Sequence, residues 1–317
     1  MIGFLLGRAA ALGATLALAS VLIFICLDIA PGDPAAYMMG LNADPAAIAA
    51  LRAELGLDAP PLQRYIDWIA GLARGDFGVS YTYRVPVADL LWERAQVSAP
   101  LAAMAFLLSA AAAFAAALFV VARRGTIAAR VTLAGAQAAI AAPNFWLALL
   151  LALTFSAGLG WFSAGGFPGW SAGAGPALHA LILPAVALAA PQAAILMRVL
   201  RASLMEALNE DYVRTARAKG ASPWRALTRH ALPNALLPAL SIMGLQASFL
   251  IAGAVVIETV FYLPGLGRLA MQAIAQRDLI VVRGVVMALV FASVVIAFIV
   301  DFLYALADPR LRRPRAS

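Results

Sequence analysis

The sequence predicts an all-α polytopic membrane protein with six transmembrane helices. Of its 317 residues, 64% are hydrophobic and 12% are charged, whereas soluble domains are about 45–50% apolar and about 25% charged. A fold of this length could not bury so much apolar surface beneath a polar exterior, so lipid is the expected solvent. Six apolar segments are long enough to cross a bilayer, which takes about 20 residues per helix. They lie near residues 9–29, 98–122, 131–157, 177–199, 236–258 and 281–306.

The charged residues predict which side of the membrane each connection occupies. Fifteen of the 23 Lys and Arg residues lie on the side that holds both termini and the connections at 123–130 and 200–235. The other side holds eight, and five of these are spread over one long segment, which weighs little in orienting a membrane protein. An excess of Lys and Arg marks the cytoplasmic side. Both termini are therefore expected in the cytoplasm, and the basic pI of about 10.2 requires no nucleic-acid partner.

The first span, within residues 1–30, is expected to be an uncleaved membrane anchor. The alternative is a cleaved signal peptide, because Arg8 precedes an apolar run that contains small residues. The apolar run continues through residues 21–27, which is long for the apolar core of a signal peptide. We therefore favour the anchor.

Segment 31–97 is too polar to span and is expected to be an extracytoplasmic segment with short amphipathic helices. Asp44 followed by Pro45 is typical of a helix start, so one helix is predicted from there to about Leu55. Two more are predicted at about 62–73 and 87–96.

The sequence offers little support for an enzyme. Lys219 is the only lysine and precedes a glycine, so the chain lacks the G-x-x-x-x-G-K-[ST] loop with which P-loop ATPases bind phosphate. Residues 265–270 resemble a dinucleotide fingerprint but follow a membrane span and lack the strand–helix context. One cysteine, Cys26, cannot form an internal disulfide, and two distant histidines argue against a zinc site. We predict no catalytic site, no metal site and no cofactor bound by this chain.

Residues 211–238 form an island of positive charge between two long apolar runs, which we call the cationic segment. Its basic side chains and its histidine are Arg214, Arg217, Lys219, Arg225, Arg229 and His230. Charge between two membrane spans must lie in water. A charged segment of this kind either binds a soluble partner or only sets the orientation of the chain.

The cationic segment predicts two short helices joined by a turn. Residues 211–219 contain no helix breaker, and Gly220 stands where a helix end favours glycine. Ser222 and Pro223 then form a typical helix start. The second helix is expected to run to about residue 231 and to end before Pro233.

The same residues resemble the EAA signature of ABC-importer permeases. The positions that match it are Ala216, Gly220, Leu232 and Pro233. The positions that depart from its general form are Arg214, Thr215 and His230, and these resemble the dipeptide/oligopeptide branch of the family. Other stretches resemble that branch in one order along nearly the whole chain. They are residues 30–34, 55–58, 63–65, 74–78, 142–146, 258–262, 264–267, 277–278 and 308–310.

The resemblance implies the type I ABC importer permease fold, with a cytoplasmic coupling helix between the fourth and fifth spans. Residues 98–306 would form the ABC transmembrane type-1 domain, and residues 307–317 a basic cytoplasmic tail. The chain would form half of a translocation pathway for di- or oligopeptides in the cytoplasmic (inner) membrane of a prokaryote. Its implied partners are a homologous second permease, two cytoplasmic ABC ATPases that bind ATP and Mg, and an extracytoplasmic substrate-binding protein. ATPase closure would drive alternating access through the EAA loop.

By the same resemblance, the residues expected to couple the chain to the ATPases lie in the cationic segment. They are Asp211, Tyr212, Arg214, Ala216, Arg217, Lys219, Gly220, Leu232 and Pro233. Two alternatives stay open: a permease for nickel chelates or glutathione, and a membrane assembly or insertion protein whose basic loop recruits another partner.

Polar residues within the spans are candidates for the substrate pathway. They are Asn144, Gln192, Gln246 and Glu258. The alternative is a structural role: interhelical hydrogen bonds for the amides, and ion pairs with arginine for the carboxylates. Such pairs would join Glu258 to Arg268 and Asp301 to Arg310. Helix kinks are expected at Pro143, Pro184, Pro191 and Pro238.

Overall fold

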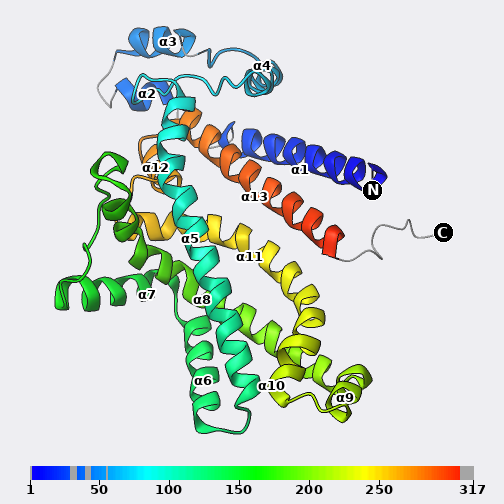
Figure 1. Ribbon diagram of the computed structural model, residues 1–317. Helices are drawn as coiled ribbons and strands as arrows, with labels where there is room; N and C mark the ends of the chain where they lie inside the picture. The colour runs from blue at the N-terminus through cyan, green and yellow to red at the C-terminus, as the bar shows by residue number, and fades with distance from the viewer. Residues whose placement is uncertain (1, 29–33, 40–43, 55, 308–317) are drawn as a thin grey trace.

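The computed structural model describes residues 2–28, 34–39, 44–54 and 56–307 (Figure 1). Its regular elements in this part of the chain are helices, as the sequence predicts. They are α1 (Ile2–Asp28), α2 (Pro34–Met39), α3 (Pro45–Glu54), α4 (Pro61–Ala73), α5 (Val87–Ala122), α6 (Ile127–Ala141), α7 (Asn144–Leu151), η1 (Ala152–Gly158), η2 (Trp170–Ala172), α8 (Ala174–Asn209), α9 (Asp211–Ala218), α10 (Pro223–Arg225), η3 (Ala226–Ala231), α11 (Leu232–Val260), α12 (Leu266–Ala275) and α13 (Leu279–Ala307).

Among the described residues, five helices are long and apolar enough to cross a membrane, and a sixth span is reached if one sharply bent pair of helices counts as one span. The five are Gly7–Leu27, Val87–Ala122, Ala174–Asn209, Pro223–Val260 and Leu279–Val300. The bent pair consists of α6 and the continuous α7–η1 segment, which meet at an angle of 111°. The kink expected at Pro143 is confirmed, and it breaks the span predicted over 131–157 into two segments. The residue before proline avoids the helical region, and Ala142 is extended with ψ 129°.

The end of one predicted helix also differs from the structure. The amphipathic helix expected at 87–96 is the first part of α5, which continues through Pro100 into the span. The predicted domain boundary at residue 98 thus falls inside a continuous helix. By contrast, α3 and α4 confirm the two other short helices, and Asp44 Oδ1 accepts a hydrogen bond from the amide of Ala46 at 3.1 Å. Leu55, the basic tail from residue 308 and the side chain of Asp301 lie outside the described residues.

The long helices pack along one another. In Figure 1, α5 runs through the length of the molecule, and α1 lies alongside α13. Helix α8 packs against both α5 and α11, and α11 packs against α13. The turn between α5 and α6 lies at one end with α9 and α10, whereas α2, α3, α4 and α12 lie at the other. The basic connections thus share one end of the molecule.

A buried carboxylate joins the segment before α5 to the start of α13. Asp278 is fully buried. Its Oδ2 accepts hydrogen bonds from Ser80 Oγ at 2.6 Å and from the amide of Thr82 at 2.9 Å. Its Oδ1 accepts one from the amide of Val281 in the first turn of α13, at 3.3 Å. A carboxylate at a helix N-terminus is also favoured by the helix dipole.

Tyr81 lies beside these bonds and is also buried. Burial raises the pKa of its hydroxyl above the ordinary value, while the nearby Arg283 acts in the opposite direction. The hydroxyl therefore stays protonated at neutral pH, and Tyr81 adds no charge to this site.

We expect Asp278→Ala to release the hairpin that carries residues 79–86. Each hydrogen bond to a charged group contributes about 1.5–3 kcal/mol, and the variant loses all three. Arg84, which is exposed at the tip of this hairpin, should then be cut faster by trypsin. Cleavage can be followed by mass spectrometry of the detergent-solubilised protein. Asp89→Ala, which removes an exposed carboxylate nearby, is the control, and equal cleavage rates in both variants would contradict the prediction.

Candidate functional site

The cationic segment begins with a helix that ends as the sequence predicts. After α9, Gly220 adopts φ +90°, in the left-handed region that favours glycine. Its amide donates to the carbonyl of Arg217 at 3.0 Å, and the amide of Ala221 donates to the carbonyl of Ala216 at 3.1 Å. These two bonds form a Schellman motif, which satisfies carbonyls at the helix end and fixes the direction of the chain.

The second helix also starts as predicted, but it does not end before Pro233. Ser222 Oγ accepts a hydrogen bond from the amide of Arg225 at 3.3 Å, and Pro223 follows as the first helical residue. The chain then continues through the π-helical turn η3 into α11 without leaving the helical region, with Leu232 at φ −56° and ψ −45°. A π turn is wider than an α turn, which gives the proline ring room beside the preceding carbonyls. As a result, one helix extends from Pro223 to Val260.

The inner face of the cationic segment is fixed to the bundle by apolar packing. Val213, Ala226, Leu227, Ala231 and Ala235 are all buried. They belong to one core cluster with residues from the second halves of α5 and α8. Burial of this kind stabilises by about 25 cal/mol per Å² of apolar surface. The segment is therefore a docked element rather than a loose loop.

A polar contact adds to this packing. Asn234 Nδ2, in the first turn of α11, donates to Tyr212 Oη at 2.7 Å. The bond ties α9 to the start of α11 across the turn at Gly220.

The outer face of the segment exposes charged side chains to solvent. The predicted coupling residues that are exposed are Asp211, Tyr212, Arg214, Arg217, Lys219, Gly220 and Pro233, while Ala216 and Leu232 are half-buried. Arg214 pairs with Asp211 at 3.4 Å, but both side chains are exposed and the pair contributes little. Trp224, which sequence reasoning did not select, is 57% exposed beside these cations. The signal in the sequence that could have indicated Trp224 was its place directly after the proline of a predicted helix start.

The structure brings two of the four predicted pathway residues together. Gln246 is buried, and its Nε2 donates to the backbone carbonyl of Gln192 at 2.6 Å, joining α11 to α8. Asn144 lies elsewhere, next to Gly253 of α11. Because residues 246, 253 and 258 span about 18 Å along a helix, the four do not form one cluster.

Glu258 lies at the far end of α11 and caps the start of α12. It is fully buried, and its carboxylate accepts hydrogen bonds from Ser98 Oγ at 2.6 Å and from the amide of Arg268 at 3.1 Å. Ser98 Oγ in turn accepts from the amide of Leu266 at 2.8 Å. Together, Ser98 of α5 and Glu258 of α11 satisfy amides in the first turn of α12.

An ion pair with Arg268 was the structural alternative for Glu258, and the arginine side chain does not form it. The guanidinium of Arg268 donates to the carbonyl of Tyr262 at 2.6 Å and lies over the Tyr262 ring, 5.0 Å from its centroid. The backbone amide of Arg268, not its charge, therefore binds the carboxylate. Tyr262 itself has φ +53°, which is unusual for a side chain of this size.

Comparison with known proteins identifies the family. The model of the family described as "Binding-protein-dependent transport system inner membrane component" matches residues 105–313. The chain belongs to this family. The model described as "Binding-prot-dependent transport system membrane comp, N-term" matches residues 1–102. The resemblance seen in the sequence is thus confirmed, and the chain is a permease subunit of a transport system.

Relatives of the permease match it along its whole length. A Brucella abortus (strain 2308) protein provisionally named a peptide transport system permease is 38% identical over 319 residues, which cover 98% of this chain and 99% of the relative. A Sinorhizobium fredii protein provisionally named a peptide ABC transporter permease is 36% identical over 309 residues, with the same two coverages. The glutathione transport system permease protein of Escherichia coli (strain K12) is 36% identical over 312 residues, again with 98% and 99% covered.

The permease has a large apolar cavity between α5, α11 and α13. Its volume is about 680 Å³. Ser98 and Glu258 are its polar lining residues, and alanines of the three helices form much of its wall. The Ser98–Glu258 pair thus borders this cavity as well as capping α12.

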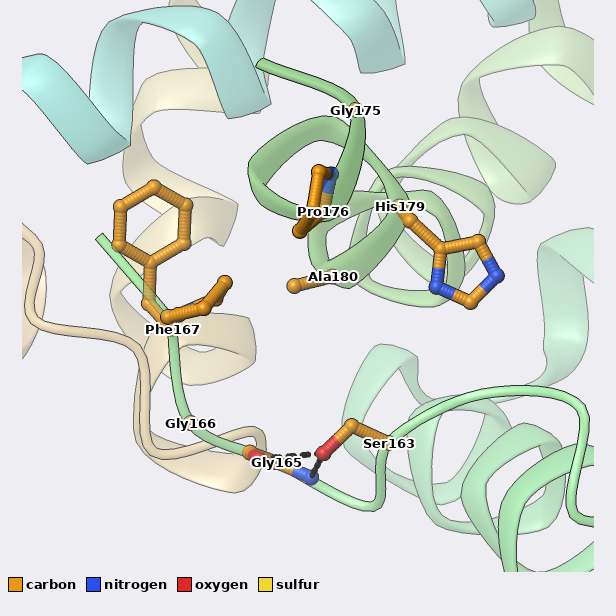
Figure 2. A pocket seen from close by; sticks show the side chains of 9 residues that line it. Ser163, Gly165, Gly166, Phe167, Gly175, Pro176, His179 and Ala180 are labelled. Atoms are coloured by element: carbon orange, nitrogen blue, oxygen red, sulfur yellow. Dashed lines mark hydrogen bonds between the residues drawn. The ribbon is translucent and has the colours of Figure 1, made fainter. Parts of the chain in front are cut away.

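A second pocket of the permease lies at the loop that precedes α8 (Figure 2). Its volume is about 670 Å³, and its lining residues include no Asp, Glu, Lys or Arg. A tight turn forms one wall, where Ser163 Oγ donates to the carbonyl of Gly165 at 2.7 Å. The ring of His179 stacks on Phe162 with centroids 4.7 Å apart. The pocket thus suits an uncharged group.

Proposed function

We propose that this permease forms half of the translocation pathway of an ATP-driven importer for di- or oligopeptides. Its partners would be a homologous second permease, two cytoplasmic ATPases that bind ATP and Mg, and an extracytoplasmic substrate-binding protein. The transporter would lie in the inner membrane of a prokaryote with both termini of this chain in the cytoplasm. The names of the Brucella and Sinorhizobium relatives support peptides as the substrate class.

The cationic segment is where an ATPase would bind. The observation that carries this proposal is the unbroken helix from Pro223 to Val260, which starts at the exposed cations and carries Glu258 in its last turn. An ATPase that grips α9 and α10 can therefore displace the fifth span directly. At 1.5 Å per residue, this helix transmits a movement over about 50 Å, to the turn that Ser98 and Glu258 hold at its far end.

Asn144, Gln192 and Gln246 remain candidates for contacts with the substrate. The hydrogen bond between the last two already supplies an interhelical role, and the Oε1 atom of Gln192 is buried without a hydrogen-bond partner among the described residues. That atom is an acceptor left for a substrate or a water molecule to satisfy.

Copurification tests the proposal. The permease is expressed with the second permease and the ATPases of its own operon, purified in detergent and assayed for ATP hydrolysis with its binding protein. We expect the ATPases to copurify and the hydrolysis rate to rise with a peptide-loaded binding protein. If the permease is purified without any associated ATPase, this result would contradict the proposal and favour an assembly or insertion protein.

Glutathione is a second candidate substrate, because a glutathione permease is among the relatives. The same assay separates the two, since the binding protein can be loaded with dipeptides, longer peptides or glutathione. Stimulation by glutathione alone would replace the peptide assignment but leave the ATPase site in place.

A further inference from the structure

Helix α4 rests on the last turns of α1. The Phe24 ring, which is 5% exposed, meets Tyr65 edge-on at 5.4 Å between centroids and stacks on Trp68 at 6.4 Å. Ser20 Oγ and Tyr65 Oη share a hydrogen bond of 3.0 Å. The guanidinium of Arg283, near the start of α13, lies 5.1 Å from the centroid of the Trp68 ring. These contacts fix α4 against the ends of two spans.

The contacts also set the height of α4 in the membrane. The apolar span of α1 is Gly7–Leu27, whose 21 residues match a hydrocarbon core of about 30 Å. Phe24 lies about one turn inside the end of that span. Tyrosine and tryptophan concentrate at this boundary between hydrocarbon and headgroups. In Figure 1, α4 is seen along its axis while α1 lies across the view, so α4 crosses α1 steeply and runs in the membrane plane.

The remaining surface of α4 is divided between apolar and polar residues. Leu62 and Ile66 are 70% and 55% exposed, and they share one face because they lie four residues apart. Gln63 and Asp67 are also exposed and share the adjoining face. This polar face lies roughly opposite the packing face, and the apolar face lies between the two.

We propose that α4 is an interfacial helix whose Leu62 and Ile66 insert into the lipid leaflet at the Leu27 end of α1. Lipid is the occupant because the outward stripe of the adjacent span is already apolar and exposed there. That stripe consists of Leu18, Leu22 and Ile25. An amphipathic helix in the membrane plane with its apolar face in the acyl boundary is a common mode of binding. The inference requires only that the chain spans a membrane, so it is independent of the substrate.

The consequence is that the extracytoplasmic segment has two fixed points. Lipid holds α4, and Asp278 holds the hairpin at residues 79–86 on α13. A movement of α13 would then be resisted by the membrane surface through α4.

Site-directed spin labelling tests this inference. Cys26→Ser removes the native thiol, and Leu62→Cys, Gln63→Cys, Ile66→Cys and Asp67→Cys are labelled one at a time in the full complex in nanodiscs. Leu18→Cys serves as the reference for lipid exposure. Accessibility to oxygen, which concentrates in lipid, is compared with accessibility to a water-soluble nickel chelate.

We expect labels at 62 and 66 to resemble the label at 18, with a severalfold higher ratio of oxygen to nickel accessibility than labels at 63 and 67. Equal nickel accessibility at all four positions of α4 would place the helix in water and overturn the inference. Labels at 62 and 66 that neither reagent reaches would show that a protein, either the second permease or the binding protein, covers this face. That outcome would also overturn it.

Discussion

Replacing Gly220 with glutamate will remove the ATPases from the complex while the permease stays folded in the membrane. A Cβ at Gly220 would have no heavy atom within 4 Å, so the variant causes no clash inside the bundle. The cost comes from φ +90°, a conformation that side chains other than glycine rarely adopt. The turn between α9 and α10 must then change shape, by a strain of about 1–3 kcal/mol. The variant also places a carboxylate among the exposed cations that we propose as the ATPase contact.

A second glycine provides a matched control for this prediction. Gly125 has φ +86°, has no heavy atom within 4 Å of a built Cβ, and lies in the turn between α5 and α6 at the same end of the molecule (Figure 1). Gly125→Glu thus introduces the same charge and the same backbone strain outside the cationic segment. Both variants are compared by membrane yield, copurified ATPase and ATP hydrolysis. Full recovery of ATPase with Gly220→Glu, or equal loss in both variants, would refute the role given to this turn.

The sequence predicted the parts of the site that depend on local signals. Gly220 ends a helix and Ser222 starts another because each acts on amides and carbonyls within a few residues. Pro233 misled the prediction because its effect depends on the turn before it. The π turn η3 accommodates the proline ring, and the amino-acid composition does not predict such a turn. This error concealed the continuity of the cationic segment with the fifth span.

Contacts between distant residues were beyond sequence reasoning. Ser98 precedes Glu258 by 160 residues, and nothing distinguishes this serine from the others in the spans. The structural alternative for Glu258, an ion pair with Arg268, named the right residue but the wrong atoms. Backbone amides at the start of a helix are strong donors to a carboxylate, and a prediction that considers only side chains as partners leaves them out. In contrast, Pro143 indicated the break after Ala141, but nothing in the sequence indicated how large the bend would be.

Replacing Glu258 with alanine will destabilise the far end of the bundle more than any exposed substitution. The variant removes the acceptor for Ser98 Oγ and for amides at the start of α12. Each buried donor left without a partner costs about 1–3 kcal/mol, and two donors lose their acceptor, so we expect a loss of about 2–6 kcal/mol. The fit is tight, because a Cβ at Gly265 would overlap the Glu258 carboxylate, and Gly265→Ala should be destabilising for the same reason. The measurement is the melting temperature in detergent, together with transport in reconstituted vesicles.

The controls distinguish a cap from a substrate contact. Glu206→Ala removes an exposed glutamate of α8 and should leave the melting temperature unchanged. Ser98→Ala should reproduce part of the Glu258→Ala loss, because it removes one bond to the carboxylate and the acceptor for Leu266. If Glu258→Ala melts like Glu206→Ala but no longer transports, the carboxylate acts in the substrate pathway instead. A loss of stability shared by Glu258→Ala and Ser98→Ala assigns it to holding α12 in place, at the far end of the helix that starts in the cationic segment.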